Sequence, residues 1–207
     1  MPLLLKHNDV DCLWGIWQMG EAYEDLCASL PSVMVAEAES RFQAPHRRQE
    51  WLSVRALLRE LAGEDCEILY RPSGKPYLLD ASTFISISHT RGYVAVILGR
   101  KPVGIDIEQY GPRVHKVASR FMRADEVANP YERDDTWSLL LHWSAKETMF
   151  KCLDTMEVDF QEHLRIFPFT PLHQGVFHAR EYKTASRRTF FIHYLLHPDF
   201  VLTWQVG

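Results

Sequence analysis

The sequence predicts an α+β fold, because helical and strand patterns occur in separate blocks instead of alternating along the chain. In the first half, three helical segments come before most of the strands. In the second half, two helical segments again come before a run of strands. With 207 residues, of which 46% are hydrophobic, the chain is long enough for one large domain or two small ones.

A long helix is the clearest element of the first half. Its apolar residues recur with the 3.6-residue period of an amphipathic helix, and Gly63 is expected to end it. The elements expected in this half are a strand at 11–19, helices at 21–30, 31–42 and 47–62, and strands at 66–70, 77–79, 84–88 and 93–98.

The second half is expected to open with a strand at 103–108, which would form a hairpin with 93–98 around the turn at 99–102. No repeat of the first half is visible by residue identity, although the order of helices and strands is similar. The other elements expected here are helices at 114–122 and 136–153, and strands at 164–167, 176–182, 189–195 and 201–205.

Two carboxylates lie on the strand predicted at 103–108. Apolar and acidic residues alternate there, so Ile105 and Ile107 would face a core. Asp106 and Glu108 would then share the opposite face. Such a pattern by itself is most often a solvated strand face, so it needs a partner before it indicates a site.

That partner is predicted about 40 residues further along, on the helix at 136–153. Trp143, Glu147 and Lys151 recur every four residues and therefore form one stripe. If the helix packs beside the acidic strand, three carboxylates and an ammonium converge. Three oxygen ligands suit Mg²⁺, and the lysine adds a second cation for a substrate phosphate. The plainer interpretation of Glu147 and Lys151 is an ion pair on a helix surface.

A serine-rich strand precedes the acidic one. Alternation points Ile85 and Ile87 inward. It points Ser86 and Ser88 outward and leaves His89 at the strand end, before a turn. A histidine in this place can donate a hydrogen bond to an anion, although a single histidine after a strand is more often structural.

Four motifs in this order and spacing resemble the 4′-phosphopantetheinyl transferase superfamily. They are Gly74-Lys75-Pro76, Ser86-Ile87-Ser88-His89-Thr90, Val103-Gly104-Ile105-Asp106-Ile107-Glu108, and Trp143-Ser144-Ala145-Lys146-Glu147 with Lys151. The resemblance runs from about residue 41 to about residue 169. The length of the chain resembles the single-chain, surfactin-synthetase-activating type.

The resemblance implies an enzyme that transfers the phosphopantetheine arm of coenzyme A to a serine of an apo acyl or peptidyl carrier protein. The reaction would depend on Mg²⁺, with coenzyme A as co-substrate, and would give holo carrier protein and adenosine 3′,5′-bisphosphate. Two other functions stay open. One is an Mg²⁺-dependent phosphoesterase that hydrolyses coenzyme A, and the other is a non-catalytic relative that binds carrier proteins or coenzyme A.

The resemblance also implies a pseudo-dimeric architecture, with two similar α+β halves and the active site between them. We therefore expect an N-terminal half, 1–100, that contributes to coenzyme A binding. The C-terminal half, 101–207, would hold the metal site and a carrier-docking helix. Because one chain supplies both halves, we expect a monomer.

Site residues follow from matching the motifs one by one. The expected metal ligands are Asp106, Glu108 and Glu147. The expected catalytic residues are Glu147, which could take the serine proton directly or through a water at the metal, and Lys151 and His89, which would contact phosphate oxygens. The residues expected to bind coenzyme A are Arg48, Gly74, Lys75, Pro76, Ser88, His89 and Lys151.

Neighbouring residues have less specific roles. Relatives hold the 3′-phosphate with basic residues near the long helix, where Arg47 and Arg48 both lie and Arg48 is one choice. Arg55 is expected to be a salt-bridge or surface residue. Trp143 is expected to support the metal helix, and Lys146 either contacts substrate or points off the stripe. Glu126 would be an indirect partner of the metal site.

The segment at 152–160 departs from the family pattern. Relatives commonly carry a glycine-rich turn there, whereas this segment contains no glycine. The departure concerns the local loop geometry and the fit of the acceptor, and it removes none of the expected metal ligands.

A basic stripe is predicted on the helix at 114–122. Its four cations fall within an arc of roughly 80° at a helical period. The stripe would dock an acidic carrier protein, and the alternative is an ordinary solvated helix face. Its members are Arg113, Lys116, Arg120 and Arg123.

Composition excludes some partners. A net charge of −4 and a pI of about 6.2 give no basic character for nucleic acid. No apolar run approaches a membrane span, and the first residues are too short for a signal peptide, so we expect a cytoplasmic protein without membrane contact. The cysteines show no C-x-x-C pair or metal-ligand spacing and are expected to be reduced thiols: Cys12, Cys27, Cys66 and Cys152.

Overall fold

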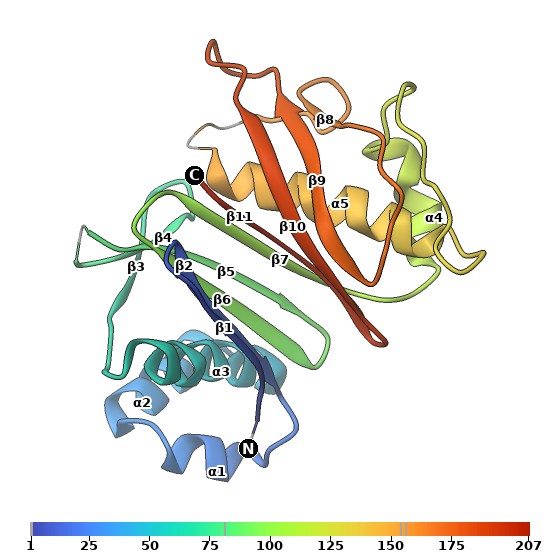
Figure 1. Cartoon of the computed structure of the whole chain (residues 1–207). Helices are drawn as coiled ribbons and strands as arrows, with labels where there is room; N and C mark the ends of the chain where they lie inside the picture. Colours follow the sequence, from blue (N-terminus) through green and yellow to red (C-terminus); the bar gives the residue numbers. More distant parts are fainter. Residues whose placement is uncertain (1, 81, 154, 156) are drawn as a thin grey trace. The chain divides into compact units, whose positions relative to one another are not determined.

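The computed structural model describes residues 2–80, 82–153, 155 and 157–207. The chain divides into two compact units, Met1–Arg100 and Lys101–Gly207 (Figure 1). Each unit combines an antiparallel sheet with helices, so the α+β class predicted from the sequence is confirmed. The glycine-free segment at 152–160 includes residues 154 and 156, which lie outside the described residues.

The first unit is a four-stranded antiparallel sheet with a long helix packed on it. The strands run in the order β1 (Leu3–Asn8), β2 (Cys12–Gln18), β6 (Tyr93–Gly99) and β5 (Phe84–Thr90). The helices are α1 (Tyr23–Ala28), α2 (Ser32–Arg41) and α3 (Pro45–Ala62), and β3 (Ile68–Tyr70) pairs with β4 (Pro76–Leu78).

Helix α3 forms the centre of this unit because its apolar stripe meets the sheet. Leu57 and Leu58 are buried in one core cluster with Val94 and Val96 of β6. The helix ends as the sequence predicts, at Gly63, whose φ of 77° is a left-handed conformation that favours glycine.

The second unit is a five-stranded antiparallel sheet covered by helix α5 (Thr136–Cys152). The strand order is β7 (Val103–Gln109), β11 (Phe200–Val206), β10 (Thr189–His197), β9 (Gln174–Glu181) and β8 (Leu164–Ile166). A short helix α4 (Arg113–Val117) and a 3₁₀ turn (Ala118–Arg120) precede α5. The core between helix and sheet includes Met149, Phe177 and Phe190.

Helix α5 lies directly against β7 and β11. Gly104 makes this possible, because a Cβ atom there would lie 2.4 Å from the Thr148 carbonyl oxygen and 2.7 Å from Cys152 Sγ. The hydroxyls of Ser144 and Thr148 form hydrogen bonds of 2.8 and 2.7 Å with the Thr203 hydroxyl of β11. Close packing and buried hydrogen bonds together fix the position of this helix on the sheet.

A fully buried ion pair ties the far side of α5 to two loops. Lys146 Nζ lies 2.8 Å from Glu126 Oε2 and donates to the carbonyl oxygens of Phe121 and Phe160, at 2.6 and 3.1 Å. The other oxygen of Glu126 accepts from the backbone N–H of Ile166 at 2.7 Å. Burial lowers the pKa of Lys146, and the Glu126 carboxylate opposes that shift. Lys146 and Glu126 are therefore structural anchors of α5.

The predicted hairpin of 93–98 with 103–108 is wrong. Strand β6 pairs with β2 and β5, whereas β7 pairs with β11 in the other sheet. The turn at 99–102 therefore joins the two units. The tight turn that does close a hairpin lies between β5 and β6, where Gly92 has a φ of 83°.

Two further elements differ from the sequence prediction. Strand β1 was not expected, because its apolar residues form a short run at one end instead of alternating. The helix expected at 114–122 ends at Val117 and continues only as a 3₁₀ turn. No helix formed by residues 2–80, 82–153 or 157–207 is long and apolar enough to cross a membrane.

The close approach at Gly104 gives a stability prediction. We expect Gly104→Ala to lower the free energy of unfolding by about 1–3 kcal/mol, because the new methyl group meets a backbone carbonyl that cannot move without shifting α5. Denaturant unfolding of the variant measures this loss. Gly111→Ala is the matched control, since a Cβ atom there meets nothing within 4 Å. Equal stability of the two variants would contradict the tight packing of α5 on β7.

Candidate active site

Strand β7 presents its acidic face to α5. Gly104, Asp106 and Glu108 alternate along the strand, so the face that meets the helix at Gly104 also carries both carboxylates. Ile105 and Ile107 are wholly buried on the opposite face, as predicted. Asp106 is itself buried, with 3% of its surface exposed, and Glu108 is half-buried. The pattern is thus not a solvated strand face.

Helix α5 supplies the partners of these carboxylates. Lys151 Nζ lies 2.8 Å from Asp106 Oδ1 and also donates to the Ile105 carbonyl oxygen at 2.9 Å. Trp143 Nε1 donates to Glu108 Oε1 at 2.7 Å. The predicted stripe therefore packs on the acidic strand, and Trp143 supports the site by a direct hydrogen bond in addition to packing.

Burial and like charge raise the pKa values of two carboxylates. Burial, followed by the charge of Asp106, raises the pKa of Glu108 to about 7, against the hydrogen bond from Trp143 and the charge of Lys151. Burial and the charge of Asp106 also raise the pKa of Glu147 to about 7, and Lys151 opposes the shift. Glu147 therefore belongs to the same electrostatic cluster as the other two acids.

The donor chemistry of this cluster fits a hard divalent cation. All three acids offer carboxylate oxygens, which Mg²⁺ prefers, and their shared burial leaves negative charge that a cation would compensate. Among the described residues, however, one oxygen from each of the three acids does not come within 4.8 Å of the others. Lys151 is the countercharge of Asp106 in this arrangement, so side-chain rotation would be needed to gather the three oxygens.

His89 lies in the first unit, at the end of β5, and borders two pockets. One pocket of about 310 Å³ is also lined by Arg47, Arg55 and Tyr70. The other, of about 450 Å³, is lined by residues that include His46, Arg91 and again His89.

Three arginines of α3 lie in different surroundings. Arg48 turns its guanidinium onto the Phe42 carbonyl oxygen, at 2.7 Å, while Arg47 lines the 310 Å³ pocket. Arg55, expected at the surface, is buried with its guanidinium carbon 3.1 Å from the centre of the Trp51 ring. Burial lowers the pKa of Arg55 to about 10. Its position four residues after Trp51, on the apolar stripe of α3, is the signal that could have revealed it.

The other residues expected to bind coenzyme A occupy a turn and a strand of the first unit. Gly74 has a φ of 83° and donates its N–H to the Arg71 carbonyl oxygen, so Gly74 and Lys75 lie in the tight turn between β3 and β4, and Pro76 begins β4. Lys75 and Pro76 are half-buried. Ile85 and Ile87 belong to the core cluster of this unit, as predicted, but Ser86 and Ser88, which were expected to point outward, are buried as well.

The basic stripe does not form as predicted. Arg113, Lys116 and Arg120 are exposed, but the helix ends before Arg120. Arg123 binds the carbonyl oxygens of Gln161 and Glu162 and the Asp125 carboxylate, so it holds a loop in place. Three exposed cations remain, and they do not share one continuous helix face.

Two curated relatives are similar to parts of the chain. A protein of Synechocystis sp. (strain ATCC 27184 / PCC 6803 / Kazusa), which carries the provisional name 4′-phosphopantetheinyl transferase slr0495, is 31% identical over 140 residues. The alignment covers 60% of this chain and 56% of that protein. The 4′-phosphopantetheinyl transferase psf-1 of Bacillus pumilus is 36% identical over 84 residues, 38% of this chain and 36% of that protein. The chain thus spans little more than half the length of the first relative.

The family comparison covers the second unit. Residues 102–204 match the model of the 4′-phosphopantetheinyl transferase superfamily. The matched segment contains Asp106, Glu108, Glu147 and Lys151, the four residues that strand β7 and helix α5 bring together. Through this segment, the chain belongs to the 4′-phosphopantetheinyl transferase superfamily.

Proposed function

We propose that this protein transfers the 4′-phosphopantetheine arm of coenzyme A to a serine of an apo acyl or peptidyl carrier protein. The products are holo carrier protein and adenosine 3′,5′-bisphosphate. The observation that supports the proposal is the packing of the α5 stripe on the acidic face of β7, which gathers three acids and a lysine in the segment that matches the family.

The three acids of this cluster are proposed to hold Mg²⁺. Asp106, Glu108 and Glu147 would be its ligands, and the ion would neutralise charge on the coenzyme A pyrophosphate. Support comes from the donor set, because buried carboxylates that repel one another gain from a shared cation.

Glu147 and Lys151 are proposed to take part in the chemistry. A carboxylate with a pKa near 7 is well suited to accept a proton at neutral pH, so Glu147 can act as the base for the serine hydroxyl. Lys151, whose ammonium now faces Asp106, can bind a phosphate oxygen once a cation takes over the charge of that acid. His89 would bind a phosphate oxygen in the same way.

The pockets of the first unit are proposed to receive the nucleotide part of coenzyme A. Arg47, Arg55 and His89 offer cationic or hydrogen-bonding groups for phosphate, and Tyr70 offers an aromatic surface. The other residues that the family resemblance assigns to coenzyme A stay proposals, namely Arg48, Gly74, Lys75, Pro76 and Ser88.

The proposal also includes a partner and an architecture. Arg113, Lys116 and Arg120 are exposed cations that suit an acidic carrier protein. A pseudo-dimeric arrangement with the active site between the halves, a monomeric state and a cytoplasmic location stay predictions from the resemblance and the sequence.

One assay separates the proposed function from its alternatives. The protein is incubated with coenzyme A, Mg²⁺ and an apo carrier protein, and the mass of the carrier is measured. A gain of one phosphopantetheine group supports the transferase. Loss of coenzyme A without a gain on the carrier supports a phosphoesterase, and binding without either change supports a non-catalytic relative.

The carboxylates give the first prediction for this activity. We expect Asp106→Asn and Glu147→Gln each to lower the transfer rate by about 10²–10³-fold, because each removes charge from the proposed metal site. Glu147→Gln should unfold at a denaturant concentration no lower than the parent protein, because burial of its carboxylate is unfavourable. Asp106→Asn should stay folded but lose some stability, because it removes the charge partner of Lys151. Glu162→Gln, an exposed acid in the same unit, is the control and should keep full activity. Parent-like rates in both site variants would refute their role.

The raised pKa values give a prediction for metal and pH. Folding raises the pKa of Glu108 and Glu147 from 4.5 to about 7, so the stability that protonation confers is complete below about pH 4.5 and is lost as the pH rises through 7. Mg²⁺ binds the ionised carboxylates and should therefore raise the melting temperature more at pH 8 than at pH 6.

Thermal unfolding with Mg²⁺ or with a chelator, at both pH values, measures this effect. Asp106→Asn is the matched variant and should lose the Mg²⁺-dependent shift while remaining folded. An equal Mg²⁺ effect at the two pH values, or an unchanged effect in the variant, would place the ion elsewhere.

The two neighbouring arginines of α3 give a prediction for coenzyme A. We expect Arg47→Ala to weaken coenzyme A binding by about tenfold or more, because it removes a charged group from the pocket. Arg48→Ala should weaken binding less and should also lower the stability, because its guanidinium binds the Phe42 carbonyl oxygen. Calorimetric titration with coenzyme A compares the two, and the reverse order of effects would favour Arg48 over Arg47 as the main phosphate ligand.

A further inference from the structure

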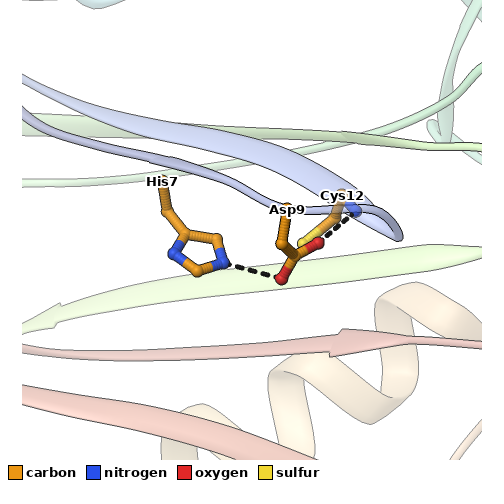
Figure 2. A group of neighbouring side chains, drawn as sticks. All are labelled: His7, Asp9 and Cys12. Atoms are coloured by element: carbon orange, nitrogen blue, oxygen red, sulfur yellow. Dashed lines mark hydrogen bonds and ion pairs between the residues drawn. The ribbon is translucent and has the colours of Figure 1, made fainter.

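The β1–β2 hairpin carries a cluster of three metal-binding side chains. His7 lies on β1, Asp9 lies in the turn, and Cys12 begins β2. One ligand atom from each residue lies within 4.8 Å of the other two (Figure 2). Among residues 2–80, 82–153, 155 and 157–207, this is the set of three His, Cys, Asp or Glu side chains whose ligand atoms lie this close together.

The turn holds Asp9 against Cys12. Asp9 Oδ1 accepts hydrogen bonds from the backbone N–H groups of Asp11 and Cys12, at 2.9 and 2.8 Å. The backbone N–H of Asp9 donates to the Cys12 carbonyl oxygen at 3.0 Å. The second carboxylate oxygen, Oδ2, is directed to the other side, where it lies 2.8 Å from His7 Nε2 (Figure 2). The carboxylate therefore stands between the imidazole and the thiol.

The strand pairing holds His7 in place. His7 lies opposite Trp14 in the antiparallel register of β1 and β2. The two rings stack with their centres 5.2 Å apart and an angle of 18° between their planes. Trp14 is buried, so it offers a fixed surface for the imidazole. All three ligands thus have a defined position before any ion arrives.

We propose that this hairpin binds one Zn²⁺ ion through His7 Nε2, a carboxylate oxygen of Asp9 and the sulfur of Cys12. One nitrogen, one oxygen and one sulfur ligand suit this borderline-soft cation, whereas Mg²⁺ prefers oxygen ligands alone. Binding replaces the thiol proton of Cys12, which passes to solvent. Three protein ligands leave the fourth tetrahedral position for water, and the ion ties β1 to β2.

The distances require only small side-chain movements. Ligands at about 2.0–2.3 Å from a tetrahedral zinc ion lie about 3.3–3.8 Å from one another. The three atoms already lie within 4.8 Å, and the His7–Asp9 contact of 2.8 Å has to lengthen slightly. Side-chain exposures of 38% for His7 and 47% for Asp9 leave a path for the ion from solvent.

The environment of Cys12 argues against a nucleophilic role for the same cluster. Cys12 is only 5% exposed, and burial, followed by the charge of Asp9, raises the pKa of its thiol to about 12. A thiol of this kind is protonated at neutral pH and poorly reactive toward substrates in solution.

Cobalt substitution tests the proposal on the full chain. The protein is stripped of metal with a chelator and titrated with Co²⁺ in excess Mg²⁺, which occupies carboxylate sites. We expect one equivalent to bind with a sulfur-to-metal charge-transfer band in the near ultraviolet, and Zn²⁺ to displace it. Cys12→Ser should remove the band, while Cys66→Ser, which replaces a half-buried cysteine of the same unit, should keep it.

His7→Gln provides a second, independent variant, because it replaces a half-buried side chain, 38% exposed, with one of similar size. We expect it to weaken Co²⁺ binding by about tenfold or more, the scale on which metal sites lose affinity when even an outer partner is removed. Absence of the band in the parent protein would overturn the proposal. A band that survives in Cys12→Ser, or an affinity unchanged in His7→Gln, would overturn it as well.

Discussion

The packing of α5 on β7 is the contact on which the candidate active site depends. It rests on the missing side chain of Gly104, which brings a helix carbonyl within reach of a strand backbone. At this separation Trp143 reaches Glu108 and Lys151 reaches Asp106 across the interface. A larger residue at 104 would displace the helix and lengthen both contacts. Burial at this interface also removes Glu108 and Glu147 from water, which is the main reason why the pKa values of these two carboxyl groups rise.

The two charged clusters around α5 show opposite uses of buried charge. The side chains of Lys146 and Glu126 are fully buried, and the single positive charge of the lysine balances the single negative charge of the glutamate. Backbone groups form their other hydrogen bonds. That pair is complete and holds the helix in place. On the opposite side, three acids face the single ammonium of Lys151. The excess of negative charge in this cluster lowers the stability of the fold. The same excess makes the cluster suitable for binding an additional cation.

Sequence periodicity predicted the elements well where apolar residues recur at the spacing of a helix or a strand. The helix ending at Gly63, helix α5 and the alternating strand β7 all follow such patterns. Strand pairing was less predictable, because residues 99–102 are equally compatible with a hairpin turn and with a link between two sheets. The same limit applies to the site. Spacing identified the stripe of α5 and is compatible with the stacking of Arg55 on Trp51, whereas the burial of Arg55 depends on tertiary packing.

Lys151 connects the stability of the fold with the proposed chemistry. In this structure it donates both to the Asp106 carboxylate and to the Ile105 carbonyl, so it holds the end of α5 on β7. A cation bound by the acids would release the lysine from Asp106 but not from the backbone oxygen. The ammonium would then stay at the site with one partner exchanged, ready for an anionic group of the substrate. A residue with two partners, only one of them ionisable, can change its charge partner without loosening the helix that carries it.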